Sequence, residues 1–209
     1  GCDIICVNLV DRTAPGKIID MAKKKNVPII FFNRELVEED LERWDKLYYV
    51  GADAKESGVL QGELAAAYLK AHPEADRNQD GVIQYVVLEG EAGHQDAILR
   101  TEYAASTLKE RGIALEKLGY ALANWNRSQA QTQVQQLLQS YGTRIELILA
   151  NNDDMALGAL DAYRASNISL PPIFGIDGTE PGLSAVRDQS LTGTVKNNGI
   201  GQAEAMLSL

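Results

Sequence analysis

The chain has 209 residues, of which 45% are hydrophobic, so it can form one large or two small packed domains and is not expected to be disordered. Its 20 Lys and Arg are outnumbered by 29 Asp and Glu, and the net charge of −9 argues against non-specific nucleic-acid binding, which needs clustered basic side chains. No apolar stretch of the sequence reaches the roughly 20 residues that a membrane-spanning helix needs.

Buried-strand patterns alternate with helix patterns along the whole chain. The predicted strands cover residues 3–9, 27–32, 47–50, 83–88, 115–121, 145–150, 173–176 and 191–196. The predicted helices cover 15–25, part of 35–46, 53–71, 95–110, 128–140, 153–165, a stretch from 179 and a stretch from 201. Apolar strands separated by amphipathic helices are typical of parallel sheets that helices cover on both faces, which predicts an α/β fold.

The two cysteines, Cys2 and Cys6, are four residues apart in the first predicted strand. At the rise of a strand this spacing is about 13 Å, whereas the Cα atoms of a disulfide lie within about 7 Å of each other. We therefore expect two free thiols, and we expect both to be buried.

A loop in the first half of the chain has the spacing of a calcium site. Oxygen-bearing side chains stand at positions 1, 3, 5 and 9 of an EF-hand pattern: Asp76, Asn78, Asp80 and Gln84. Gly81 stands at the turn position, and Val82 follows at position 7, where a backbone carbonyl serves as the ligand. Position 12 should be a glutamate but is Val87, so the last ligand must come from elsewhere, and Glu146 at the start of a strand is the best candidate. The alternative is an Asp/Asn/Gly turn that binds nothing.

Polar side chains follow six of the predicted strands. They are Asn33, His94 and Asp96 with Arg100 one turn later, Trp125, Asn152, Asp177 and Asn197. Ligands of open parallel sheets bind beyond the carboxyl ends of the strands. Amides, carboxylates and a guanidinium can pair with sugar hydroxyls, and an indole can stack on the C–H face of a pyranose. The pattern predicts a sugar site, although Asn152, Asp153, Asn126 and Asp177 could each instead be a helix N-cap.

A catalytic function is not indicated. No serine, cysteine or threonine stands beside a histidine as a nucleophile pair, and the phosphate-binding patterns GxGxxG and GxxxxGK[ST] do not occur. The carboxylates within 89–96 lie in a single loop and not on two sides of a glycosidic bond. We expect a binding protein and not an enzyme.

Seven stretches carry a resemblance to a known family. They cover residues 7–11, 27–33, 49–58, 76–81, 93–96, 150–153 and 193–195. Together they resemble the periplasmic galactose/glucose-binding proteins of bacterial transport and chemotaxis, and the resemblance extends over essentially the whole chain. Gln95 stands where this family commonly has proline, and Asn126 stands where it usually has an acidic residue.

The resemblance implies two lobes of the type I periplasmic-binding-protein fold that close on one hexose, galactose or glucose. Residues 1–50 would form a partial N-terminal lobe, 51–196 the C-terminal sugar- and calcium-binding lobe, and 197–209 a return into the N-terminal lobe. Gly1 stands directly before a strand and Leu209 inside a helix pattern, so we expect a chain that is cut at both ends.

The resemblance also assigns roles to individual residues. The implied sugar contacts are Asn33, His94, Asp96, Arg100, Trp125, Asn152, Asp177 and Asn197. The implied ligands of Ca²⁺ are Asp76, Asn78, Asp80, the carbonyl of Val82, Gln84 and Glu146. The implied partners are a membrane ABC transporter and a chemoreceptor, and the implied location is the periplasm, with the protein either free or anchored by a lipid.

The main alternative is the effector domain of a sugar-responsive transcription repressor of the same fold. The calcium loop favours the solute-binding protein, because a repressor of that fold has no reason to carry one. A sugar-processing enzyme is a further alternative, which incubation with a hexose would test.

Overall fold

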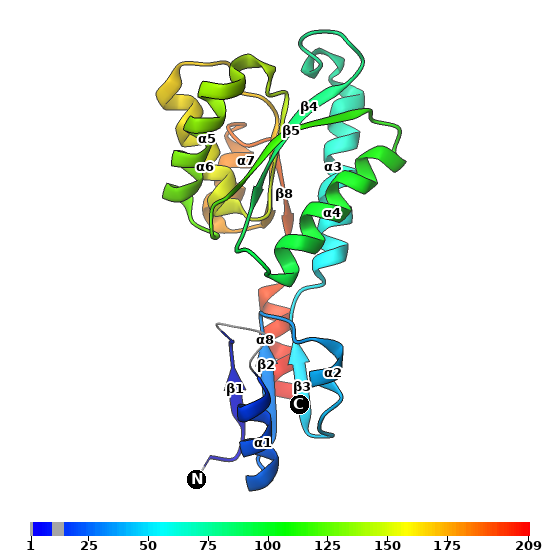
Figure 1. Ribbon diagram of the computed structural model, residues 1–209, viewed down its shortest axis with the longest axis vertical. Coiled ribbons are helices and arrows are strands. Elements are labelled where there is room, and N and C mark those ends of the chain that lie inside the picture. Colours follow the sequence, from blue (N-terminus) through cyan, green and yellow to red (C-terminus); the bar gives the residue numbers. More distant parts are fainter. Residues whose placement is uncertain (1, 10–14) are drawn as a thin grey trace. The chain divides into compact units, whose positions relative to one another are not determined.

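The computed structural model describes residues 2–9 and 15–209 (Figure 1). Residues 10 and 11 of the matched stretch 7–11 lie outside the described residues. The chain divides into two compact units, one formed by Gly1–Asp53 with Asn198–Leu209 and the other by Ala54–Asn197. The lobe boundaries expected from the sequence lie at residues 50/51 and 196/197.

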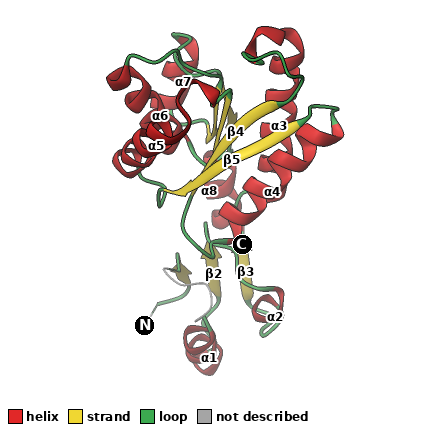
Figure 2. Ribbon diagram, turned by 45° about the horizontal axis from the view of Figure 1, so that its top comes forward, coloured by secondary structure: helices red, strands yellow, loops and turns green. Residues whose placement is uncertain are grey.

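The larger unit, Ala54–Asn197, contains a parallel sheet of five strands in the order β5-β4-β6-β7-β8. The strands are β4 (Ile83–Glu89), β5 (Leu115–Leu122), β6 (Leu147–Ala150), β7 (Ile173–Asp177) and β8 (Gly193–Lys196). The helices are α3 (Ala54–Ala71), α4 (Gln95–Glu110), α5 (Arg127–Tyr141), α6 (Asp153–Ser166) and α7 (Glu180–Arg187), with short 3-10 turns at Pro73–Ala75 and Gly142–Arg144. Figure 2 shows α3 and α4 on one face of this sheet and α5 and α6 on the other.

Alternation along the central strands explains why helices cover both faces. Val86 and Leu88 of β4 join a core with residues of α5 and α6, whereas Tyr85 and Val87 join a core with residues of α3 and α4. Because successive side chains of a strand point to opposite faces, a strand that is apolar throughout must have a covering layer on each side. The predicted α/β fold with covered parallel sheets is confirmed.

Two glycines of α3 bring this helix close to α4. A Cβ atom at Gly62 would lie 2.7 Å from the carbonyl oxygen of Ala104 and 2.7 Å from Cβ of Thr107. A Cβ atom at Gly58 would lie 3.0 Å from the carbonyl oxygen of Arg100 and 3.1 Å from its Cα atom. The helices therefore pack with backbone near backbone, and a larger residue at either position would push α4 away from α3.

The smaller unit contains a parallel sheet in the order β1-β2-β3. Its strands are β1 (Ile5–Val7), β2 (Ile29–Phe32) and β3 (Leu47–Val50), and its helices are α1 (Gly16–Lys25), α2 (Glu38–Leu41) and α8 (Gly199–Ser208). Ile19 of α1 packs with Ile29 and Phe31 of β2 in its core.

The expected burial of the cysteines is wrong. Cys2 and Cys6 are both free, as expected, but both are exposed. Ile5 and Val7 pack against the core of the smaller unit, so the side chain of Cys6 between them points to the other face of β1. Because β1 is an edge strand, the apolar run of the sequence overstated its burial.

Replacing Gly62 by alanine tests the close packing of α3 on α4. Alanine normally favours a helix over glycine by up to about 1 kcal/mol, but here the added methyl group meets backbone atoms, so we expect the free energy of unfolding to fall by about 1–3 kcal/mol. Denaturant unfolding of Gly62→Ala and Gly199→Ala checks this. The control carries the same change at a helical position with no atom within 4 Å of the new Cβ. Equal or higher stability of Gly62→Ala than of the parent would contradict the packing.

Candidate functional site

Seven of the eight predicted sugar contacts lie in the larger unit, at the carboxyl ends of its strands. His94 is the N-cap of α4, and Asp96 and Arg100 lie in the first two turns of that helix. Trp125 stands in the loop between β5 and α5, and Asn152 is the N-cap of α6. Asp177 ends β7 and Asn197 follows β8. The parallel order of the strands brings these ends to one edge.

Arg100 is the centre of this arrangement and is only 5% exposed. Its Nη2 donates to Oδ2 of Asp96 at 3.3 Å, and its Nη1 donates to the carbonyl of Asn151 at 2.8 Å and to Oδ1 of Asp177 at 3.5 Å. Its Nε is buried and has no hydrogen-bond partner among the described residues. A buried donor without an acceptor costs about 1–3 kcal/mol, so the position of this guanidinium is unfavourable for folding by itself.

The indole of Trp125 forms a half-buried apolar wall beside Arg100. The guanidinium carbon of Arg100 lies 5.7 Å from the indole ring centre, and the His94 ring meets the indole edge-on with ring centres 5.0 Å apart. Nδ2 of Asn152 donates to the carbonyl of Trp125 at 3.4 Å. A Cβ atom at Gly90 would lie 2.1 Å from the indole, so only glycine leaves room for the ring.

Asp177 closes the other side of the site. Its Oδ1 accepts a hydrogen bond from Nδ2 of Asn197 at 2.9 Å, and Oδ1 of Asn197 in turn accepts one from the hydroxyl of Ser57 at 3.3 Å. Burial raises the pKa of Asp177 to about 6; the nearby charge of Arg100 opposes this rise, and the charge of Asp153 adds to it. The φ of Asp177 is 113°, a strained conformation of the kind that gathers at functional sites.

The structure assigns N-caps to two of the four residues for which capping was the alternative; Asp153 is not a cap, because it follows the cap Asn152 as the first residue of α6. Oδ1 of Asn152 accepts from the backbone N–H of Met155, and Oδ1 of Asn126 accepts from that of Gln129. Asp177 is not a cap, because Thr179 caps α7. Capping uses only the amide oxygen of Asn152, so its nitrogen can still orient the loop of Trp125.

Asn33, the eighth predicted sugar contact, lies in the smaller unit. It follows β2 with a φ of 68°, and its Nδ2 donates to Oδ1 of Asn8 at 3.4 Å. The hydroxyl of Tyr49 donates to its carbonyl at 3.2 Å. Asn33 is therefore held in place within its own unit.

Three buried polar residues at the edge were not predicted as part of the site. Oδ2 of Asp153 accepts from the backbone N–H and the hydroxyl of Thr179, which ties α6 to the start of α7. Nε2 of Gln61 donates to the carbonyl of Ala150 at the end of β6 and to the carbonyls of Phe174 and Gly175 within β7. Asn151 accepts from Arg100. The sequence signal for Asp153 and Asn151 was their place after a strand, but Gln61 lies inside a helix and carried no signal.

The predicted calcium loop lies beside Glu146. This glutamate is 1% exposed, and its carboxylate accepts from the backbone N–H groups of Arg77 at 2.7 Å, Asn78 at 3.3 Å and Gln84 at 3.1 Å. The side chain thus joins both ends of the loop, although it stands more than 60 residues further along the chain.

The polar side chains of the loop converge. Nδ2 of Asn78 donates to Oδ2 of Asp80 at 2.9 Å and to Oε1 of Gln84 at 3.2 Å, and Nε2 of Gln84 donates to the same Oδ2 at 3.0 Å. The carboxylate of Asp76 accepts from the backbone N–H groups of Asp80 and Gly81. A half-turn of each amide would put oxygen where nitrogen now stands, so the residues present fit a hard cation such as Ca²⁺.

Acidic and histidine side chains alone do not make a metal site here. Among the residues that the structure describes, no group of three or more His, Cys, Asp or Glu is placed to hold a metal ion. A cation in this loop would therefore also need the amide oxygens of Asn78 and Gln84 and backbone carbonyls.

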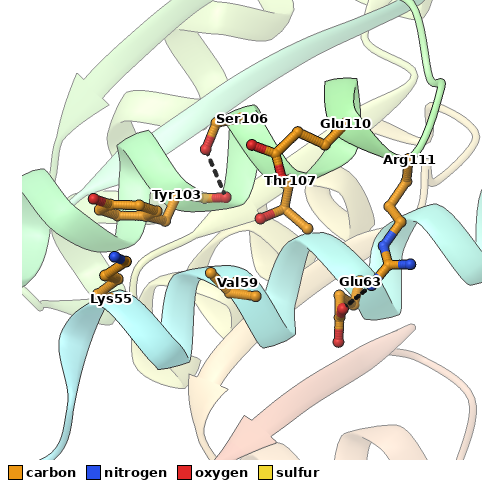
Figure 3. Close-up of a pocket in the computed structure, with 8 residues that line it drawn as sticks. All are labelled: Lys55, Val59, Glu63, Tyr103, Ser106, Thr107, Glu110 and Arg111. Carbon is orange, nitrogen blue, oxygen red and sulfur yellow. Dashed lines mark hydrogen bonds and ion pairs between the residues drawn. The ribbon is translucent and has the colours of Figure 1, made fainter.

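A separate groove of about 480 Å³ lies along α3 and α4 (Figure 3). It is lined by Lys55, Val59, Glu63, Tyr103, Ser106, Thr107, Glu110 and Arg111. Arg111 pairs with Glu63, and the ammonium of Lys55 lies 4.9 Å from the ring centre of Tyr103. The groove contains none of the predicted site residues.

None of the described helices is both long enough and apolar enough to cross a membrane.

The raised pKa of Asp177 makes stability depend on pH. The pKa in the folded protein, about 6, lies above the ordinary value of 3.8, so the folded state keeps the proton to higher pH and stability falls as pH rises through that window. Asp177→Asn should remove this part of the dependence of unfolding free energy on pH. It should also raise the free energy of unfolding at pH 7 by about 1–2 kcal/mol, allowing for partial exposure of the carboxylate. Denaturant unfolding between pH 4 and pH 7 measures both effects, and a slope unchanged by the substitution would contradict the cause given.

Comparison with known proteins agrees with this architecture. The model of the periplasmic binding protein domain matches residues 1–209. The D-galactose/methyl-galactoside binding periplasmic protein of Haemophilus influenzae is 41% identical over 210 residues, which cover 100% of this chain and 63% of that protein. A xylitol-binding protein of Mycolicibacterium smegmatis is 31% identical over 100% of this chain and 55% of its own length.

A solved structure of a solute-binding protein is also similar to this chain. A solute-binding protein of an ABC transporter from Bacillus halodurans C-125, with bound myo-inositol, is 32% identical with a TM-score of 0.76, over 90% of this chain and 61% of that one. The chain spans less than two thirds of the length of these relatives, which are binding proteins and not enzymes. On the match over its whole length, the chain belongs to the periplasmic binding protein family.

Proposed function

We propose that this protein is a solute-binding protein which captures a hexose, galactose or glucose, and delivers it to a membrane ABC transporter. The observation that carries the proposal is made at one edge of the sheet, where Arg100 forms ion pairs with Asp96 and Asp177 and its guanidinium lies beside the Trp125 ring. Carboxylates and a guanidinium beside an indole match the two faces of a pyranose, because the hydroxyls need paired donors and acceptors and the C–H face needs an apolar surface.

Support for a hexose comes from the relative that binds D-galactose and methyl-galactoside. Other relatives are named for xylitol and ribose, so the family alone does not select the sugar. Within the site, the His94 ring lies against the indole and the side chain of Asn152 donates to the backbone carbonyl of Trp125, and both side chains have nitrogen atoms suited to sugar oxygens. The family description and the galactose-binding relative support a periplasmic location. A chemoreceptor partner stays a prediction of the sequence.

Sugar binding can be measured by thermal shift and calorimetry with galactose, glucose, ribose, xylitol and myo-inositol. A sugar at about 100 times its dissociation constant should stabilise the protein by roughly 2.7 kcal/mol. Trp125→Leu should weaken binding at least tenfold through loss of the stacking surface, whereas Trp44→Leu, a tryptophan of the smaller unit, should change stability alone. A response to none of these ligands would contradict the proposal, and a preference for ribose or xylitol would contradict the hexose.

We also propose that the loop from Asp76 to Gln84 binds Ca²⁺. The ligands would be Asp76, Asn78, Asp80, the carbonyl of Val82, Gln84 and Glu146. The support is the convergence of Asn78, Asp80 and Gln84 and the attachment of Glu146 to the backbone at both ends of the loop. The bound ion would neutralise the carboxylates of the loop and so stabilise the fold where β4 begins, without any part in chemistry.

Calcium binding is tested by unfolding the protein in Ca²⁺ and in chelator. The parent should melt higher in Ca²⁺, and Asp80→Asn should lower the affinity for the ion at least tenfold, since it removes one charge without shortening the side chain. Asp188→Asn is the matched control, because this aspartate also accepts from the backbone in an exposed turn. Equal melting of the parent in Ca²⁺ and in chelator would refute the site.

A further inference from the structure

Asn151, the residue that follows β6, is 1% exposed and lies directly beneath the proposed sugar site. Its backbone N–H donates to the carbonyl of Leu88 at 2.9 Å, which continues the pairing of β6 with β4 past the last residue of the strand. Its own carbonyl accepts from Nη1 of Arg100 at 2.8 Å. The backbone of Asn151 therefore holds the guanidinium of Arg100 against the end of the sheet.

The side chain of Asn151 joins two further segments. Its Oδ1 accepts from the backbone N–H of Gly90 at 3.1 Å, and its Nδ2 donates to the hydroxyl of Thr101 at 3.0 Å. Gly90 belongs to the loop that leaves β4, and Thr101 is the neighbour of Arg100 on α4. All four polar groups of Asn151 thus contact the protein. It can affect a sugar only through the residues it holds.

The contact with Gly90 also concerns the indole of Trp125. The indole lies against Gly90 so closely that a Cβ atom there would meet Cζ2 at 2.1 Å. The carbonyl of Gly90 accepts from the backbone N–H of Asn124, the residue before Trp125, at 3.2 Å. A shift of Gly90 would therefore move both the surface beneath the indole and the backbone that leads into it.

We infer that Asn151 is a positioning residue of the sugar site, which keeps the guanidinium of Arg100 and the indole of Trp125 at a constant spacing. The inference rests on the proposed function, since it takes these two groups to be the polar and the stacking contact of the sugar. Asparagine suits the task because one short planar group supplies an acceptor to Gly90 and a donor to Thr101. Leucine has the same branching and the same number of heavy atoms, and supplies neither.

The test uses the protein in a Trp44→Phe background, where fluorescence reports Trp125 alone. Asn151→Leu should weaken hexose binding at least thirtyfold and should shift the emission of Trp125 before any sugar is added. Thr101→Val should weaken binding three- to tenfold. The double variant should lose little more affinity than Asn151→Leu, because the contact that Thr101→Val breaks is already lost in Asn151→Leu. Leu108→Ala, two turns beyond Arg100 on α4, is the control for lost stability, and it should melt lower with affinity and emission unchanged.

Three outcomes overturn the inference. Asn151→Leu could bind within threefold of the parent, it could leave the emission of Trp125 unchanged, or Leu108→Ala could lose as much affinity. If Asn151→Leu does not fold, unchanged affinity and emission of Thr101→Val overturn it instead. Failure of the parent to bind any hexose refutes the proposed function. In that case the sugar-free emission still decides whether Asn151 positions the indole.

Discussion

The guanidinium of Arg100 is buried at the carboxyl edge of the larger sheet, and a buried cation is stable only where acceptors surround it. Its acceptors come from Asp96 in α4, Asn151 after β6 and Asp177 at the end of β7. These residues are far apart in the chain. The parallel register, in which Leu88 of β4 lies opposite Ala150 of β6, makes the strands end at one level and so brings the acceptors together. The polar edge thus depends on the apolar core beneath it.

This edge contains buried polar atoms to which the described residues offer no hydrogen-bond partner. Nε of Arg100 and Oε1 of Gln61 are buried without hydrogen-bond partners among the described residues, and burial raises the pKa of both Asp153 and Asp177. Each of these features costs stability in the absence of a ligand. Binding sites commonly hold such unfavourable groups, because a ligand that satisfies them gains the energy that the empty protein lacks. The edge of the sheet therefore lowers the stability of the fold, as the proposed sugar site would lead one to expect.

Sequence patterns predicted the fold well because the pattern and the packing have one cause. The largely apolar runs of 83–88 and 145–150 are strands with a helix layer on each face, and the buried stripe of α4 has the three- to four-residue spacing of a helix within 95–110. The missing twelfth position of the loop pointed to Glu146, which lies at the loop because Gln84 and Glu146 are neighbours across β4 and β6. The burial of Cys6 was overestimated, since a local run does not show which strand is at the edge.

Polar networks were harder to predict than the strands that support them. Asn151, Asn152 and Asp153 stand together in the sequence, yet one joins Gly90 to Thr101, the next caps α6, and the third holds the start of α7. Nothing in their residue types distinguishes these roles, because an amide or a carboxylate bonds to whatever partner the tertiary structure supplies. Gln61 shows the limit clearly, since a glutamine inside a helix is usually a surface residue and this one is fully buried.

The glycine contact between α3 and α4 links helix packing to the polar edge. Gly58 faces the backbone of Arg100 itself, at a separation that leaves no room for a methyl group without movement of α4. The position of Arg100 therefore depends on Gly58 of α3, whose lack of a side chain lets α4 approach closely. The affinity of the proposed sugar site can in consequence change through a substitution on α3, at a glycine that lies against the backbone of α4.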